Sequence, residues 1–246
     1  MRQLLPHPVD DVDPEAVYGT VERVPVDGRP WVLSDFVSSA DGSATDEGRS
    51  RGLSGPGDRQ VFHVLRHLAD VILVGASTVR IEGYRPARAG DAVRAARRAR
   101  GQAPVPPIAV CSQTLQFDWG SPFFADTEAR PLVLTSSSAD ADARARAAEV
   151  ADVVVAGDER VDLGLALREL GRMGHSVVLT EGGPTLHAEL ALAGLLDELC
   201  LTLAPRLVGG EGPRITNGPA LEPPRELALA HVLEEDGFLF LRYERA

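Results

Sequence analysis

Short apolar runs recur along the chain, and segments with helical periodicity lie between them. Several runs are apolar at consecutive positions, which is typical of strands that are buried on both faces of a parallel sheet. They are too short to cross a membrane, since a spanning helix needs about 18 apolar residues or more. The runs predicted as strands cover residues 31–39, 70–77, 106–112, 130–138, 151–157, 175–183 and 197–210.

Amphipathic or alanine-rich segments separate these strands and are predicted as helices. Pro56 and Pro184 stand at the starts of two of them, where proline fits the first helical turn. Ser77 and Ser138 are the candidate N-caps of two others. The predicted helices cover residues 56–69, 90–104, 138–150, 161–174 and 184–195, with a short helical turn at 77–83.

The two ends of the chain differ from this alternating pattern. Residues 225–245 form two strand-like runs that meet at Asp236-Gly237, a dipeptide typical of a hairpin turn. Residues 1–30 are rich in proline and aspartate, lack periodicity and are predicted as an extended N-terminal arm. We therefore expect a single α/β domain over residues 31–246, with a mostly parallel central sheet, flanking helices and an antiparallel C-terminal hairpin.

Composition and charge narrow the class of function. The chain has 246 residues, of which 44% are hydrophobic, and its formal net charge is −11. All 25 basic residues are arginine, so no lysine is present to form a Schiff base with a substrate. An acidic chain with scattered arginines is unsuited to general nucleic-acid binding. An anionic ligand would instead be held by a few arginines or by backbone N–H groups.

Signals for targeting and for metal binding are absent from the sequence. The first residues contain no apolar core of signal-peptide length, so we expect a cytoplasmic protein without membrane association. Cys111 and Cys200 lie in strand-like runs and are expected to be buried thiols. No paired cysteine motif and no Cys/His cluster occurs, so no metal site is expected.

Two predicted strands end in glycine, at LVGAST (73–78) and LTEGGPT (179–185). Glycine lets the backbone approach a ligand closely, and the helix that follows offers N–H groups to an anion. Taken alone, either stretch is more often a plain turn, whereas two such strand ends in one sheet favour a nucleotide site. Asp41 presents the same choice, because it begins a long loop either as a turn residue or as a functional carboxylate. The GxGxxG and Walker A signatures are absent, so a dinucleotide would bind in a non-Rossmann manner.

Three segments together resemble a known family. In order, they are SSADGSAT (38–45), LSGPGDRQVFHVLRHLADVILVGASTV (53–79) and LTEGGPTLHAELALAGLLDELCLTLAPRLVGG (179–210). They resemble the reductase domain of riboflavin biosynthesis, which is the C-terminal half of the bacterial bifunctional deaminase/reductase and is related in fold to dihydrofolate reductase. The zinc signature of the deaminase half, H-x-E…P-C-x-x-C, is absent, so we expect a stand-alone reductase.

The resemblance implies a reaction and a set of ligand contacts. It implies an NADPH-dependent reduction of 5-amino-6-(5-phosphoribosylamino)uracil, or of a related pyrimidine, in a homodimeric enzyme. Asp41 is the candidate proton donor, with water as the alternative. Implied substrate contacts come from Asp41, Ser50, Glu181 and Arg66, the last holding a phosphate. Implied cofactor contacts come from Gly75, Ala76, Ser77, Thr78, Glu82, Ser112, Gly182, Gly183, Pro184, Thr185 and Leu186, with Ser112 and residues 136–138 near the 2′-phosphate.

The substrate side of the sequence departs from the family pattern at Ser43, Gly52 and residues 82–90. Two other hypotheses therefore stand beside the first. One is a dihydrofolate-reductase-like reduction of a pterin or folate, and the other is a non-catalytic NADP(H)-binding protein. Turnover of the aminouracil phosphate, turnover of dihydrofolate, or cofactor binding without turnover would distinguish the three.

Overall fold

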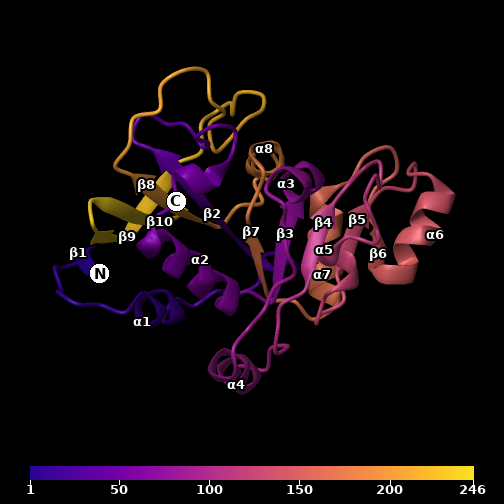
Figure 1. The fold of residues 1–246 in the computed structure, drawn as a ribbon, viewed down its shortest axis with the longest axis horizontal. Coiled ribbons are helices and arrows are strands. Elements are labelled where there is room, and N and C mark those ends of the chain that lie inside the picture. The colour runs from indigo at the N-terminus through magenta and orange to yellow at the C-terminus, as the bar shows by residue number, and fades with distance from the viewer. The chain divides into compact units, whose positions relative to one another are not determined.

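The computed structural model describes residues 1–246, and the chain folds into two compact units (Figure 1). The first unit contains Met1–Arg23, Val32–Arg66 and Thr180–Ala246. The second unit contains Val24–Trp31 and His67–Leu179. Each unit is therefore assembled from segments that lie far apart in the sequence.

The first unit is built on the strands β1, β9, β10, β8 and β2, which neighbour one another in this order. β2 and β8 are parallel, whereas the β8–β10, β10–β9 and β9–β1 pairs are antiparallel. The strands are β1 (Arg2–Leu5), β2 (Trp31–Ser39), β8 (Glu198–Ala204), β9 (Leu227–Glu235) and β10 (Phe238–Arg245). The helices are α1 (Pro14–Gly19), the 3-10 helix η1 (Ser50–Gly52), α2 (Pro56–Leu68) and α8 (Pro184–Leu192).

A buried ion cluster joins the strands of this unit. The Glu198 side chain is fully buried and accepts hydrogen bonds from Arg23 Nη2 and Arg242 Nε, each at 2.8 Å. A buried carboxylate needs such partners because it has lost its hydration. The cluster thereby fixes β8, β10 and the segment after α1 against one another.

The second unit is built on the strands β7, β3, β4, β5 and β6, which neighbour one another in this order. The β3–β4, β4–β5 and β5–β6 pairs are parallel, and every side chain of β5 is buried. The strands are β3 (Val71–Gly75), β4 (Ile108–Cys111), β5 (Leu132–Thr135), β6 (Asp152–Val155) and β7 (Val177–Thr180). The helices are α3 (Ala76–Ile81), α4 (Asp91–Ala99), α5 (Pro122–Ala125), α6 (Ala141–Val150) and α7 (Leu163–Arg172).

The fold class predicted from the sequence is confirmed: strands and helices alternate, the sheet pairs are mostly parallel outside the C-terminal region, and β9 and β10 form an antiparallel hairpin. The hairpin turns at Asp236 and Gly237, whose φ values of 52° and 81° suit a two-residue turn. Within residues 1–30, for which an extended arm is predicted, the structure has β1 and α1. None of the helices is long and apolar enough to cross a membrane.

Three local predictions were wrong. Gly75, not Ser77, is the N-cap of α3, because the helix begins directly where β3 ends. Asp140, not Ser138, caps α6, since its carboxylate accepts the N–H of Ala143 at 2.8 Å. Cys200 is buried as expected, but Cys111 keeps part of its surface exposed.

Candidate functional site

The turn after β7 is the most sharply defined feature of the first unit. Gly182 has a φ of +79°, and a Cβ atom built on it would lie only 2.7 Å from Cζ of Phe36. The next peptide bond, between Gly182 and Gly183, is cis. Both the positive φ and the close aromatic ring exclude a side chain at position 182. Glycine at this position is therefore required by the path of the backbone.

The helix that follows this turn begins without a side-chain cap. Pro184 is the first residue of α8, as predicted, and Gly183 occupies the N-cap position without offering a side chain. The first turn contains no acidic residue. The positive end of the helix and the N–H groups near Thr185 and Leu186 thus meet no anionic side chain of the helix itself.

Arg66 and Glu181, both predicted to contact substrate, form one ion pair. Nε and Nη2 of Arg66 donate to the two carboxylate oxygens of Glu181 at 2.6 and 2.7 Å. The guanidinium also lies 4.2 Å from the ring centroid of Phe62, a cation–π contact. Glu181 therefore fixes the guanidinium group of Arg66, and a ligand would meet the two side chains as one ion pair.

Asp35 lies in β2, and sequence analysis did not single it out. Burial and the carboxylates of Asp58 and Glu181 raise the pKa of the Asp35 carboxyl well above its usual value, while Arg66 opposes them. The residue nevertheless keeps part of its surface exposed. The available signal was a single acidic residue in the apolar run WVLSDFVSS.

Asp41 lies in the loop after β2 and has well-defined hydrogen-bond partners. Ser39 Oγ donates to its carboxylate at 2.5 Å, and the N–H groups of Val208 and Gly209 donate at 3.2 and 2.7 Å. These three donors lower the pKa of Asp41 to about 2. The carboxylate is therefore ionised at neutral pH and ties the end of β2 to the segment after β8. Ser50, the other loop residue predicted, begins η1.

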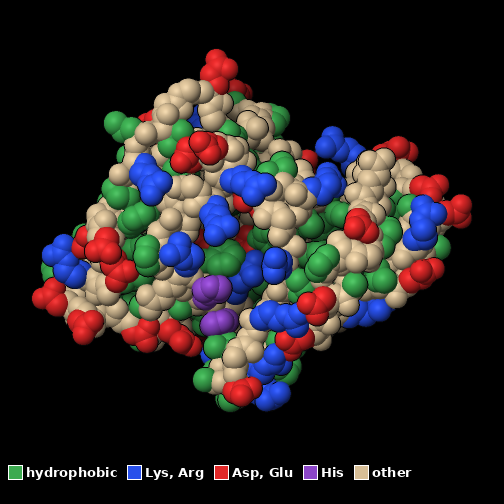
Figure 2. Space-filling model, viewed as in Figure 1, with side chains coloured by type: hydrophobic (Ala, Val, Ile, Leu, Met, Phe, Trp, Pro, Cys, Tyr) green, Lys and Arg blue, Asp and Glu red, His purple; other side chains and the backbone are tan.

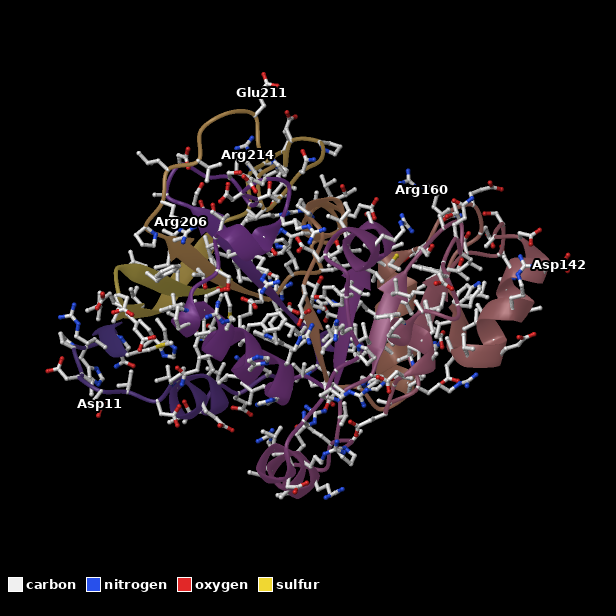
Figure 3. The ribbon with its side chains drawn as sticks, viewed as in Figure 1. Asp11, Asp142, Arg160, Arg206, Glu211 and Arg214 are labelled. Carbon is white, nitrogen blue, oxygen red and sulfur yellow. The ribbon has the colours of Figure 1, made fainter.

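The segment between β8 and β9, residues 205–226, is a long loop that is attached to the site residues at several points. Figure 3 shows Arg206 near its base and Glu211 at its outer tip. Nη1 of Arg206 donates to the carbonyl of Gly52 at 2.5 Å, and the N–H of Asn217 donates to the carbonyl of Pro184 at 3.1 Å. The loop thereby lies against both η1 and the start of α8.

His187 in α8 is a second residue that the sequence did not reveal. Its Nδ1 lies 3.1 Å from the carbonyl oxygen of Ile215 and 3.0 Å from Oγ1 of Thr216, and its ring centroid is 4.5 Å from that of Phe36. Burial lowers the pKa of His187 to about 4. A neutral histidine therefore joins α8, Phe36 and the long loop, and it sets the position of the ring that contacts Gly182.

In the second unit, the predicted residues Gly75, Ala76, Ser77 and Thr78 form the junction of β3 and α3. Gly75 is extended at the N-cap, Ser77 is exposed, and the other three are partly buried. Glu82 is the C-cap of α3, where its N–H donates to the carbonyl of Thr78 at 3.0 Å. This junction places the end of β3 directly before the first turn of α3.

The predicted hydroxyl residues of the second unit also lie at strand ends. Ser112 follows β4, and its Oγ accepts the N–H of Leu115 at 3.1 Å. The hydroxyls of Ser136 and Ser138, after β5, lie 3.0 Å apart, and Gln113 Nε2 donates to both. Oγ1 of the neighbouring Thr135 is buried and has no hydrogen-bond partner. A cluster of hydroxyl groups therefore lies where β4 and β5 end.

Surface charge and the distribution of ligand-type residues complete the description. On the face drawn in Figure 2, arginine side chains are interspersed with aspartate and glutamate. No group of three or more His, Cys, Asp or Glu side chains is arranged to hold a metal ion. The features that suit a ligand are thus the turn after β7 with the Arg66–Glu181 pair, and the strand ends of the second unit.

Comparison with known proteins gives a consistent result. The sequence model of the RibD C-terminal domain matches residues 30–236. The 2,5-diamino-6-ribosylamino-4(3H)-pyrimidinone 5′-phosphate reductase of Methanothermobacter thermautotrophicus is 32% identical over 85% of this chain and 95% of its own length. The protein of the same name from Archaeoglobus fulgidus is 32% identical over 77% of this chain and 87% of its own. The crystal structure of a pyrimidine reductase-like protein from Corynebacterium diphtheriae, 26% identical, matches with a TM-score of 0.82 over 96% of this chain and 99% of that one. This chain therefore belongs to the RibD C-terminal domain family.

Proposed function

We propose that the protein is an NADPH-dependent reductase of riboflavin biosynthesis that converts a ribosylamino-pyrimidine 5′-phosphate to its ribityl form. One observation carries this proposal: the sequence match extends over nearly the full length of relatives named as stand-alone reductases of this kind. Their names specify the 2,5-diamino-pyrimidinone, which retains its 2-amino group. We therefore place this compound first as the substrate and 5-amino-6-(5-phosphoribosylamino)uracil, expected from the sequence, second.

Each unit by itself offers contacts that suit part of a nicotinamide dinucleotide. In the first unit, the uncapped start of α8, at the partly exposed Gly183, suits a phosphate group. In the second unit, the β3–α3 junction and the hydroxyl cluster after β4 and β5 offer polar contacts, including the unpaired buried hydroxyl of Thr135. Bound NADPH would supply the hydride, and the protein would supply its position and its surroundings.

On the substrate side, the protein's own side chains would hold and orient the substrate. We assign the Arg66–Glu181 pair to substrate contact as a unit, with the guanidinium facing the phosphate. We assign Asp41 to positioning, because a carboxylate with a pKa of about 2 has no proton to give at neutral pH. Ser50 stays in the proposed substrate contacts, since η1 is held by the same long loop that Asp41 anchors.

We further propose that the protein acts as a homodimer in the cytoplasm, joined through β9. β1 pairs only with residues Val232 to Glu234 of β9, so the outer edge of Leu227–His231 has no strand partner in the chain. Leu227 and Leu229 on this stretch are 45% and 42% exposed. An apolar strand edge of this kind favours pairing with a second copy. Light scattering would report a dimer, and Leu229→Lys should shift it to monomer.

The decisive experiment mixes purified protein and NADPH with each of the two pyrimidine phosphates, and separately with dihydrofolate, while following the loss of NADPH absorbance. Turnover of either pyrimidine phosphate supports the proposal. Turnover of dihydrofolate alone, or cofactor binding without any turnover, would replace it with one of the two other hypotheses.

The cofactor placement has its own test. Gly183→Val adds a branched side chain at the N-cap of α8 and should abolish NADPH affinity, measured by calorimetry, while the circular dichroism spectrum stays unchanged. Gly90→Val is the matched control, because Gly90 is an N-cap with similar extended backbone angles. Equal NADPH affinity in the two variants would contradict the placement at α8.

A further inference from the structure

His187 is a buried polar side chain that joins three elements of the first unit. The residue lies on α8 and is only 3% exposed. Its Nε2 lies 3.3 Å from Oγ of Ser34 on β2, and its Nδ1 lies 3.0 Å from Oγ1 of Thr216 in the long loop. Burying an imidazole is costly unless its nitrogens find polar partners. The contacts at both nitrogens offset this cost, so they fix the orientation of the ring.

One tautomer of His187 satisfies every polar group along this line. With the proton on Nε2, the ring donates to Ser34, whose hydroxyl donates to the carbonyl of Glu198 at 3.2 Å. Nδ1 then accepts the hydroxyl proton of Thr216. An apolar side chain of similar size would fill the same space but remove both contacts. The polar ring therefore holds the long loop in a way that packing alone does not.

Residues 215–218 of the long loop follow α8 from its first residue onward. The N–H of Asn217 donates to the carbonyl of Pro184 at 3.1 Å. Three positions further along α8, the ring of His187 lies against Thr216. Residues three positions apart lie on the same face of a helix, so segment 215–218 covers one face of α8 at its start.

The same segment approaches α8 closely at Gly218. A Cβ atom built on Gly218 would lie only 2.7 Å from Cβ of Ala188. This distance excludes a side chain at position 218 unless the segment moves away from the helix. The close approach does not depend on the hydrogen bonds of His187, and it therefore offers a second, independent way to displace segment 215–218.

His187 also acts on the turn that precedes α8. Its ring centroid lies 4.5 Å from that of Phe36, and Cζ of Phe36 is the atom that a Cβ on Gly182 would meet. One imidazole thus bounds the start of α8 in two ways, through Phe36 at Gly182 and through the loop at Pro184. The start of α8 is the place proposed above for a cofactor phosphate.

We propose that His187 is a positioning residue for NADPH, which holds segment 215–218 as one side of the phosphate site at the start of α8; this inference rests on the function proposed above. His187 is buried and acts through the segment. Without its polar contacts, a smaller fraction of the molecules has the segment in place, and NADPH affinity falls with that fraction. Since one hydrogen bond is at stake, the affinity should fall by about 3–10-fold.

The first test compares His187→Asn, His187→Gln and His187→Leu by calorimetric titration with NADPH. An asparagine amide reaches the position of Nδ1 and keeps the loop contact, a glutamine amide reaches that of Nε2 and keeps only Ser34, and leucine keeps neither. The Asn variant should therefore retain the affinity of the wild type, while the Gln and Leu variants lose about 3–10-fold, in KM for NADPH rather than in kcat. An Asn variant as weak as the Leu variant would overturn the assignment, because a merely structural role predicts no such rescue.

The second test leaves His187 in place. Gly218→Ala should push segment 215–218 away from α8 and lower the NADPH affinity by a similar factor. Gly19→Ala is the matched control in the same unit, because nothing lies within 4 Å of the place that its Cβ would take. Wild-type affinity in Gly218→Ala would show that the segment does not border the phosphate site, whether or not the His187 variants fold.

Hydrogen exchange without any ligand separates this inference from the proposed function. The amide of Asn217, which donates to Pro184, should exchange faster in His187→Leu than in the wild type or in His187→Asn. If its exchange is the same in all three proteins, the inference fails even when NADPH binds and a pyrimidine phosphate is reduced. If the exchange differs as expected but the wild type neither binds NADPH nor reduces a pyrimidine phosphate, the proposed function fails, and the role of His187 in NADPH binding fails with it.

Discussion

Replacing Gly182 with alanine should destabilise the protein for two separable reasons. The residue has a φ of +79°, and an L-residue in a left-handed conformation costs about 1–2 kcal/mol. The new Cβ would also lie 2.7 Å from Cζ and 3.0 Å from Cε1 of Phe36, and overpacking of this kind costs about 1–3 kcal/mol. Phe36 has little room to move, because its ring is in contact with His187. The expected total is therefore about 2–5 kcal/mol.

Urea unfolding followed by circular dichroism measures this loss. Gly194→Ala is the matched control, because Gly194 has a φ of +68° and nothing lies within 4 Å of the place that its Cβ would take, so only the backbone cost of about 1–2 kcal/mol applies. Adding Phe36→Leu to Gly182→Ala should relieve the collision and give a coupling energy of about 0.5–3 kcal/mol. Equal losses in the two alanine variants, with no coupling to Phe36, would refute the argument that the ring requires glycine at position 182.

Three further predictions follow from the buried and capped groups. Glu198→Gln strands the buried Arg23 and Arg242 and should lower the free energy of unfolding by about 3–5 kcal/mol in urea. Burial alone would raise the pKa of Glu198, but the two arginines lower it overall. The stability of the wild type should therefore fall as the pH drops through the folded-state pKa, and Glu198→Gln should lack this dependence. The pKa of His187 is about 4 in the folded protein and 6.5 in the unfolded chain, so His187 is neutral in the fold. Acidification from pH 6.5 to 4 should therefore lower the free energy of unfolding by up to about 3 kcal/mol. The same pH dependence in a His187→Gln variant would contradict this. Asp41→Ala removes the acceptor for the N–H groups of Val208 and Gly209, and hydrogen exchange of these two amides should accelerate while the amides of β10 keep their protection.

The sequence was sufficient for the order of elements because each strand and helix has its own local signal. The apolar runs, the prolines at 56 and 184 and the Asp236-Gly237 turn act within a few residues, and each corresponds to an observed feature. The caps of α3 and α6 were missed because several residues near each helix start could serve, and only the backbone path selects Gly75 and Asp140.

The sequence likewise predicted residues of the candidate site but not the contacts between them. The motifs placed Glu181 and the double glycine at a strand end, and the family resemblance added Arg66 from a helix 115 residues away in the sequence. The ion pair between these two side chains is a long-range contact, which no local sequence pattern encodes. The loop of residues 205–226 was likewise only an irregular stretch until its contacts to Asp41, Gly52 and His187 were known.

The directions of the aspartate pKa shifts were decided by tertiary structure alone. Asp35 lies in the middle of β2 and Asp41 in the loop just after it, and the sequence favoured Asp41 because it precedes a glycine in a recognisable motif. Folding gives Asp41 three hydrogen-bond donors, whereas burial, together with the carboxylates of Asp58 and Glu181, acts on Asp35, so the two pKa values move in opposite directions. The sequence by itself determined the elements and the family, because these depend on local patterns. Only the tertiary structure determined in which direction the pKa of each aspartate moves, because a pKa depends on the charges and the solvent that surround the folded side chain.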